Sequence, residues 1–327
     1  MVRFILRRLI LIPLALLGVN FIAFSFSHLA IYFHRLQNPF GSLAIQPVPV
    51  FSLYKSYLIN SAHLNFGIMP DSTKAPIGQA VIKAAGNSLG LLAVAFLLST
   101  TIGLLIGLRA VRNEPATASP WLVPISAIGM AMPSFYLGTI FILAGIYFAI
   151  MGGPDAKPPI PIQGFGWDAH LILPVLSLMV RPTVQIAQLT SELLSGELGK
   201  QYVVAARSHG NTWNVVRWKH ALRNVLAPII LTVTGSFRLL IGELILVEWL
   251  FAWPGLGRLL TFALIPPNVA TVAGLSGSTQ YFLNPELIAA VLTVFTLIFL
   301  IADTLASISV RLVDPRLRVH EQEVGNV

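Results

Sequence analysis

Residues 84–108 read AAGNSLGLLAVAFLLSTTIGLLIGL, an uninterrupted run of 25 residues without a formal charge between Lys83 and Arg109. A membrane-spanning helix needs about 20 predominantly apolar residues, so this run is long enough to cross a bilayer. Two further stretches have the same character, because 26 uncharged residues separate Arg8 from Arg35 and forty uncharged residues run from Pro115 to Pro154. These three segments predict a membrane protein built from spanning helices.

The composition of the chain excludes a water-soluble enzyme. Of the 327 residues, 55% are hydrophobic and only 10% are charged, whereas a soluble domain carries about 25% charged residues. The net charge of +8 would favour nucleic-acid binding in a soluble protein, but here we expect contact with membrane lipid and no nucleic-acid partner. Because the chain has no cysteine, disulfides, thiolate metal sites and cysteine nucleophiles are excluded. The scattered histidines lack zinc-site spacing, so no metal site is expected.

Three more spans are expected where apolar runs contain isolated charges, which makes the protein an all-α membrane protein with six transmembrane helices. Residues 259–285 are also uncharged, but PPN at 266–268 and GLSGS at 274–278 break that stretch, which we therefore assign to a loop. We expect one transmembrane domain over residues 1–327, with spans at about 9–30, 86–108, 121–150, 169–190, 225–250 and 286–310. The spans are connected by an outer loop at 31–83, a long loop at 191–224 and an outer loop at 251–285.

The positions of the basic residues predict the orientation. With the N-terminus inside, 13 of the 21 Lys and Arg residues flank the cytoplasmic ends of the spans and six lie outside, as the positive-inside rule requires. Both termini are therefore expected in the cytoplasm. The apolar run after the basic N-terminus is too long for a signal peptide and is expected to remain as the first span.

Four charged residues fall within the fourth and fifth spans, namely Arg181, Arg238, Glu243 and Glu248. Each costs at least about 2.5 kcal/mol on insertion, so it needs a partner or water. Arg238 and Glu243 are five residues apart, about 140° around a helix, and do not share a face. A pair between Arg181 and either glutamate is geometrically easier. Buried ion pairs that fix helix register, a polar lining of the translocation path, and snorkelling towards lipid headgroups all remain open. Asp303, near the cytoplasmic end of the sixth span, is assigned to interfacial solvation.

The loop 191–224 has the pattern of two short helices. Tyr202, Ala206 and Gly210 follow at a spacing of four, which predicts one helical face with small residues. Gly210 suits a left-handed helix end, and Thr212 suits the cap of a second helix. That helix carries an apolar stripe of Val215, Trp218, Leu222 and Val225. An interfacial helix and a docking surface for a cytoplasmic protein are both compatible with this pattern.

The stretch Trp253-Pro254-Gly255-Leu256-Gly257 follows the fifth span. Its glycines and proline predict a tight re-entrant turn at the outer interface, with Trp249 and Trp253 as aromatic anchors. Glu248 is expected near this turn, as a cap.

The loop and its flanks resemble the membrane subunits of ATP-binding-cassette importers, in which an Ala-Ala-x-x-x-Gly element forms the coupling helix. Here this element is Ala205-Ala206-Arg-Ser-His-Gly210. The whole chain is similar to the first permease subunit (B-type) of the dipeptide/oligopeptide/nickel importer family. The matching segments include MPSFYLGTIFIL at 132–143, KHALRNVLAPI at 219–229, VEWLFAWPGLGRLL at 247–260 and LVDPRLR at 312–318. The acidic residue that usually opens the coupling segment is replaced by Gln201.

The resemblance implies a type I importer transmembrane fold in a bacterial or archaeal inner membrane. It implies a sister permease subunit, two cytoplasmic ATPase subunits and an extracytoplasmic binding protein that delivers a peptide substrate. Tyr202, Ala205, Ala206 and Gly210 would contact an ATPase, and Trp253, Pro254, Gly255 and Gly257 would belong to an outer gate.

The chain has no GxxxxGK[ST] phosphate loop, so ATP and Mg²⁺ are expected on the ATPase partners, with no cofactor and no enzymatic activity in this chain. Nickel-chelate or oligosaccharide uptake is the alternative within the family. An ion-coupled secondary transporter is a further alternative, although the inverted repeats typical of that class are not seen.

Overall fold

The computed structural model describes residues 2–36, 49–70, 74–112, 116–153, 158–266 and 280–313. These residues form helices joined by loops, with two isolated β-bridges. Within this part of the chain, six helices are long and apolar enough to cross a membrane: Leu6–His34, Ile77–Arg109, Ser134–Met151, Ala169–Leu198, Trp213–Leu250 and Pro285–Ser309. The prediction of an all-α protein with six spans is confirmed.

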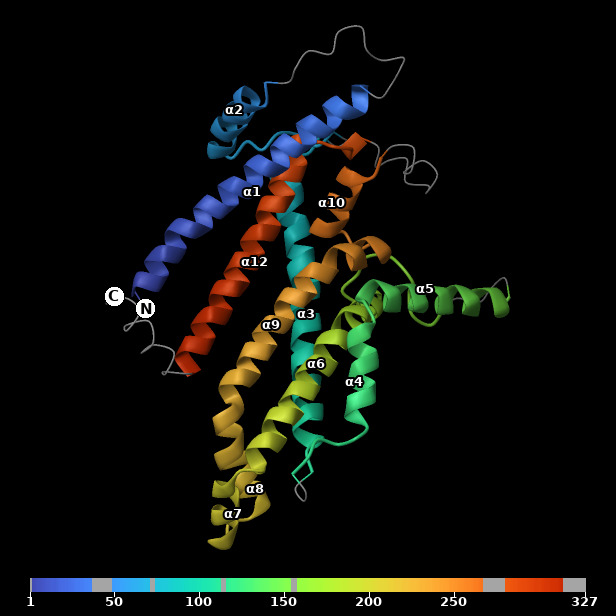
Figure 1. Cartoon of the computed structure of the whole chain (residues 1–327). Coiled ribbons are helices and arrows are strands. Elements are labelled where there is room, and N and C mark those ends of the chain that lie inside the picture. Colours follow the sequence, from blue (N-terminus) through green and yellow to red (C-terminus); the bar gives the residue numbers. More distant parts are fainter. Residues whose placement is uncertain are drawn as a thin grey trace. The chain divides into compact units, whose positions relative to one another are not determined.

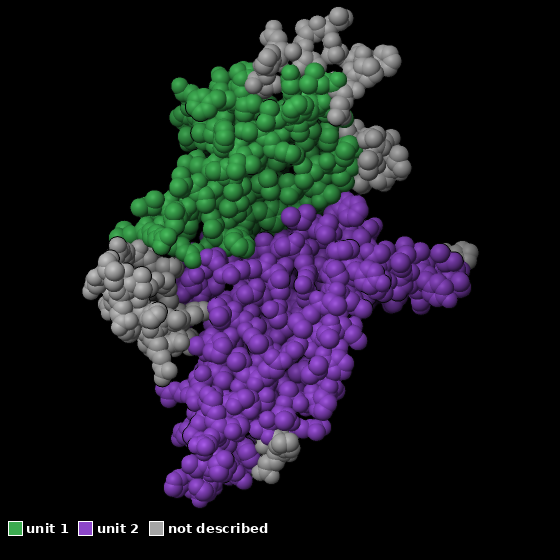
Figure 2. Space-filling view, viewed as in Figure 1, with its two compact units in different colours: residues 1–90, 252–300 green, residues 91–251, 301–327 purple. Residues whose placement is uncertain are grey.

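The contacts divide the expected single domain into two compact units (Figure 2). Unit 1 comprises residues 1–90 and 252–300, and unit 2 comprises residues 91–251 and 301–327. Two helices contribute to both units, α3 (Ile77–Arg109) and α12 (Pro285–Val313).

In unit 1, α1 (Val2–Leu36) packs against α2 (Val50–Ala62), a helix within the predicted outer loop 31–83. The buried rings of Tyr54 and Tyr57 on α2 face Phe24 of α1, and the ring centroids of Phe24 and Tyr57 are 4.9 Å apart. The Asn20 amide donates a hydrogen bond to Thr293 Oγ1 of α12 at 2.9 Å. An aromatic cluster and a polar contact therefore hold α1 to its neighbours.

Unit 2 is built around α6 (Ile172–Leu198) and α9 (Leu222–Leu250), which run side by side in Figure 1. The C-terminal half of α3 approaches α6 at Gly103 and Gly107. A Cβ atom at Gly107 would lie 2.6 Å from the carbonyl oxygen of Ala187, and one at Gly103 would lie 2.8 Å from that of Thr183. Small residues spaced by four allow two membrane helices to pack backbone against backbone. Gly103 and Gly107 of the charge-free run 84–108 thus have a packing role.

The expected single span at 121–150 is wrong in one respect. The structure has two helices there, α4 (Leu122–Ala131) and α5 (Ser134–Met151), which run in different directions (Figure 1). Met132 and Pro133 between them are extended, with ψ angles of 114° and 149°. Proline disfavours the helical conformation of the residue before it, and a search for uncharged runs does not detect such a break. Only α5 is long enough to count as the third span.

The fourth and fifth spans continue beyond their expected ends. The helix of the fourth span runs to Leu198, and the helical run that contains the fifth span starts at Trp213, through α8 (Trp213–Val215) and η2 (Val216–Ala221). The expected coupling loop 191–224 therefore reduces to the short helix α7 (Gln201–Ser208) and its two connections. In the expected outer loop 251–285, the described part holds α10 (Leu256–Leu264), whereas residues 267–279 of the predicted Pro- and Gly/Ser-rich stretch lie outside the described residues.

The predicted stripe of Val215, Trp218, Leu222 and Val225 is wrong, because Val215 and Trp218 are exposed. The buried positions are instead Val216, Ala221, Val225 and Ile229. The first step in this series is five residues, and η2 is a π-helix, whose hydrogen bonds connect residue i with i+5. The extra residue in this turn shifts the buried face by one position relative to an ideal α-helix.

Candidate functional site

Glu197 anchors the corner where α6 ends and α7 begins. Its side chain is only 7% exposed, and Oε2 lies 2.5 Å from Lys200 Nζ. On the other carboxylate oxygen, Oε1 accepts a hydrogen bond of 2.8 Å from the Asn224 amide of α9. A buried carboxylate is stabilised when both oxygens have partners. This residue therefore links the end of α6, the start of α7 and α9.

Tyr202 and Val203 continue this anchor into α7. Val203 is 2% exposed and belongs to an apolar cluster with Leu194, Leu198 and Val225. Burial, and next the nearby Glu197 carboxylate, raise the pKa of Tyr202 to about 12. The phenol is therefore neutral at any physiological pH. The inner side of α7 is therefore fixed to the rest of unit 2 by apolar packing, with the neutral Tyr202 ring packed against the same cluster.

The opposite side of α7 is open. Val204 is 69% exposed, and Ala205 is exposed while Ala206 is half-buried. The expected common face of Tyr202, Ala206 and Gly210 is only partly present, because α7 ends at Ser208 and Gly210 lies beyond it. Gly210 has a φ of +85°, as predicted for a left-handed helix end, and a Cβ there would meet nothing within 4 Å.

The connection after α7 is held by Arg207. Its Nη1 donates a hydrogen bond of 2.8 Å to the Asn211 carbonyl oxygen, and its guanidinium lies 4.9 Å from the centre of the Trp213 ring. Thr212 precedes α8 as predicted, but its side chain makes no capping hydrogen bond. The result is an exposed knob, residues 204–210, that protrudes from the ends of α6 and α9 (Figure 1).

Arg181 and Glu243 form an ion pair between the two central helices of unit 2. Arg181 Nη1 lies 2.7 Å from Glu243 Oε1, and the side chains are 36% and 15% exposed, respectively. Among the described residues, the buried Oε2 of Glu243 has no hydrogen-bond partner. The structure thus selects Glu243 from the two partners that the sequence left open for Arg181.

Arg238 of α9 pairs with Asp303 of α12. The assignment of Asp303 to interfacial solvation is therefore wrong, because its carboxylate neutralises an arginine within a span. Glu248 has a completely buried side chain in α9. The unusual charges of the fourth and fifth spans are thus spread over two helix pairs, α6–α9 and α9–α12.

The turn Trp253–Gly257 is docked onto α3 within unit 1. Trp253 Nε1 donates to the carbonyl oxygen of Asn87 at 3.1 Å, and the Asn87 amide donates to the carbonyl oxygen of Pro254 at 2.9 Å. The backbone N–H of Leu256 donates to Ser88 Oγ at 2.9 Å. Trp253 is fully buried, so its expected role as an interfacial anchor is wrong, whereas Trp249 is 41% exposed.

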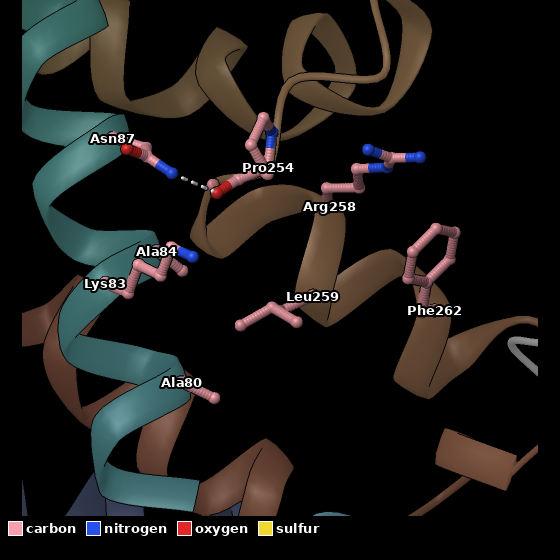
Figure 3. Close-up of a pocket in the computed structure, with 9 residues that line it drawn as sticks. Ala80, Lys83, Ala84, Asn87, Pro254, Arg258, Leu259 and Phe262 are labelled. Carbon is pink, nitrogen blue, oxygen red and sulfur yellow. Dashed lines mark hydrogen bonds between the residues drawn. The ribbon is translucent and has the colours of Figure 1, made fainter. Parts of the chain in front are cut away.

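A cavity of about 240 Å³ lies beside this turn, between α3 and α10 (Figure 3). Its polar lining includes Lys83 and Asn87 of α3 and Arg258 of α10, with Pro254 and Gly255 of the turn at one side. Arg258 Nη1 donates to the Ala252 carbonyl oxygen at 2.6 Å, and burial lowers the pKa of its guanidinium from the usual value. Sequence reasoning did not bring Lys83 and Arg258 together.

Metal chemistry has no support in the part of the chain that the structure describes, which holds no group of three His, Cys, Asp or Glu side chains suited to a metal ion.

The family model described as the binding-protein-dependent transport system inner membrane component matches residues 99–319, more than half of the chain. The chain belongs to this family. As an inner membrane component it has the type I importer fold expected from its motifs. The matched region contains the knob, both ion pairs and the Trp253 turn.

Two relatives show how far the similarity extends. A protein of Brucella suis biovar 1 (strain 1330), provisionally named a peptide transport system permease protein, is 32% identical over 232 residues, covering 70% of this chain and 71% of the relative. The dipeptide transport system permease protein DppB of Escherichia coli (strain K12) is 27% identical over 354 residues, covering 97% of this chain and 99% of the relative. This inner membrane component therefore matches dipeptide permease DppB over nearly its whole length.

Sequence reasoning missed two residues of the knob's anchor, Glu197 and Asn224. Both lie in the segment 191–224 that was assigned to the coupling loop, where a buried carboxylate is not expected.

Proposed function

We propose that this chain is the membrane-spanning subunit of an ATP-driven importer and forms half of the translocation path for short peptides. An extracytoplasmic binding protein delivers the peptide, a sister permease subunit completes the path, and two cytoplasmic ATPase subunits hydrolyse ATP. Relatives named as peptide and dipeptide permeases support peptides over nickel chelates or oligosaccharides as the substrate.

The observation that carries this proposal is the exposed knob of residues 204–210. An apolar residue such as Val204, 69% exposed, is suited to a groove on a partner protein. The buried side of the same element is fixed by Glu197, Tyr202 and Val203, so a force on the knob would be transmitted to α6 and α9. In this proposal the knob faces the cytoplasm, as the basic residues around it predict.

The test is to substitute tryptophan at Gly210 and measure peptide uptake in proteoliposomes containing the whole transporter. The Gly210→Trp side chain would enter open space, so the chain should insert and assemble. We expect uptake to fall at least about tenfold while ATP hydrolysis continues without being stimulated by the loaded binding protein, because the bulky ring holds the ATPase away from the knob.

Gly153→Trp is a matched control. Gly153 follows α5, has a φ of +88° and also has open space around its Cβ position, so it carries the same backbone strain as Gly210. If Gly210→Trp imports peptide as fast as Gly153→Trp, the knob is not the ATPase-coupling element. Uptake of a labelled oligosaccharide or nickel chelate, with no uptake of dipeptides, would contradict the substrate class.

A further inference from the structure

Unit 1 has a large excess of positive charge. Its carboxylate residues are Asp71 and Glu286, against eight basic residues: Arg3, Arg7, Arg8, Arg35, Lys55, Lys74, Lys83 and Arg258. In unit 2, by contrast, Arg181 and Arg238 have acidic partners. Two of the eight basic residues of unit 1, Lys83 and Arg258, line the same cavity.

The described part of the chain provides no carboxylate for these two cations. Neither makes an ion pair with a described residue, and no described acidic side chain lines the cavity. The residues that follow α10, 267–279, contain no Asp or Glu. A cavity lined by two cations and by no described carboxylate is a favourable environment for an anion.

Arg258 is held in place by neutral groups. Its Nη1 donates to the Ala252 carbonyl oxygen, at a residue with a φ of +57°, and its guanidinium lies 5.1 Å from the centre of the Phe262 ring. A carbonyl and an aromatic ring orient the guanidinium but leave its full charge and its remaining N–H groups available. This arrangement resembles a preorganised anion receptor more than a structural ion pair.

The remaining lining is apolar and lies at the start of a membrane span. Ala80, Ala84, Leu259 and Phe262 form these walls, and Lys83 directly precedes the 25 uncharged residues 84–108. A lysine at the end of an apolar run sits at the level of the lipid headgroups. The cavity therefore combines two cations at headgroup depth with an apolar surface suited to glycerol and the first methylene groups.

We propose that this cavity binds the phosphate of an anionic phospholipid headgroup. The guanidinium of Arg258 would bind two phosphate oxygens side by side, and the ammonium of Lys83 would act as a point charge. The volume of about 240 Å³ is below the range of about 300–1,000 Å³ for pockets that enclose drug-sized ligands, so it suits a headgroup rather than a whole peptide. A bound lipid would fix the Trp253 turn against α3.

The experiment measures lipid retention by the complete transporter. The complex is delipidated in detergent, incubated with vesicles of phosphatidylglycerol and phosphatidylcholine in equal amounts, repurified and examined by native mass spectrometry. We expect the wild type to retain phosphatidylglycerol and the variant Lys83→Gln/Arg258→Gln to retain about tenfold less, because the variant loses both charged groups that would contact the phosphate.

The control is Lys55→Gln/Lys74→Gln, which removes two exposed basic residues from the same unit without touching the cavity. If the Arg258 substitution prevents assembly, Lys83→Gln alone serves, since Lys83 is exposed and forms no ion pair with a described residue. A drop in retention of about threefold is then expected. Equal retention by the cavity variants and the control would overturn the proposal.

The same preparation also distinguishes the lipid from two other possible ligands of the cavity, inorganic phosphate and an acidic side chain of the binding protein. Retention of inorganic phosphate in pure phosphatidylcholine vesicles, without any preference for phosphatidylglycerol, would overturn the lipid as ligand. Unchanged lipid retention together with weaker docking of the binding protein would assign the cations to an acidic side chain of that protein and would also overturn it. None of these outcomes depends on which substrate is transported.

Discussion

At the scale of single residues, Glu197 should be sensitive to substitution, because its charged side chain is buried where α6, α7 and α9 meet. Glu197→Gln leaves Lys200 without its partner and keeps the contact with Asn224. We expect a loss of about 1–3 kcal/mol of stability, seen as a lower midpoint of thermal unfolding of the purified complex. Glu192→Gln is the control on the same helix, since Glu192 is exposed and accepts a hydrogen bond only from Gln188 among the described contacts. Equal shifts for both variants would contradict the anchor role.

The pair of Arg181 and Glu243 lends itself to a test of its function. Arg181→Ala alone should harm assembly, because removing one partner leaves a buried charge, which costs about 3–5 kcal/mol. The double variant Arg181→Ala/Glu243→Ala removes both charges and should assemble normally. If the partly exposed arginine lines the translocation path, we expect peptide uptake by this double variant to fall about tenfold. Normal uptake by the well-assembled double variant would limit the pair to fixing helix register.

The two arginines also show what the sequence allows at this scale. The spacing of five residues indicated that Arg238 and Glu243 do not share a helix face. Two glutamates, Glu243 and Glu248, remained as possible partners of Arg181, and the structure shows that Glu243 is the partner. The spacing did not identify Asp303, because the direction in which a neighbouring helix presents a side chain depends on packing that the sequence pattern does not contain. Asp303 therefore looked like an ordinary residue at the membrane surface.

At the scale of helices, substitution by alanine is expected to have opposite effects on stability at two glycines of α3. Gly107→Ala places a methyl group 2.6 Å from the carbonyl oxygen of Ala187, and backbone cannot move aside cheaply, so α3 and α6 must separate. We expect a lower unfolding midpoint for the purified transporter and a lower yield of assembled complex. Gly86→Ala has open space and should raise stability by about 0.5–1 kcal/mol, because alanine restricts the unfolded chain. A fall of equal size for both would contradict close packing at Gly107.

Helix ends were harder to predict than helix number. Long apolar runs, three of them uncharged and three with isolated charges, located all six spans because a bilayer imposes a minimum apolar length. The count of uncharged residues joined α4 to α5, since Met132 and Pro133 are as uncharged as their neighbours. It also ended the fourth span at residue 190 and began the fifth at 225, because helices that extend beyond the bilayer become polar without ending. The π-helical turn at Val216–Ala221 displaced the predicted stripe, and no periodicity analysis with a fixed period anticipates that shift.

At the scale of the whole molecule, the remaining question is which side of the membrane the knob faces. The distribution of basic residues predicts that both termini and the knob lie in the cytoplasm and that α2 lies outside. The natural absence of cysteine makes this directly testable with single substitutions. Ser52→Cys on α2 and Ser208→Cys on α7 are suitable, because cysteine is close in size to serine and both positions are exposed.

We expect a membrane-impermeant maleimide to label Ser52→Cys in intact spheroplasts and to label Ser208→Cys only after the membrane is permeabilised. The unmodified cysteine-free chain reports background labelling. Coexpression of the ATPase subunits should then slow the labelling of Ser208→Cys in permeabilised membranes, because a docked ATPase covers the knob, while Ser52→Cys reacts at an unchanged rate. Labelling of Ser208→Cys in intact spheroplasts would contradict the predicted topology. It would also contradict the assignment of the knob to an ATPase, since ATP is available only in the cytoplasm.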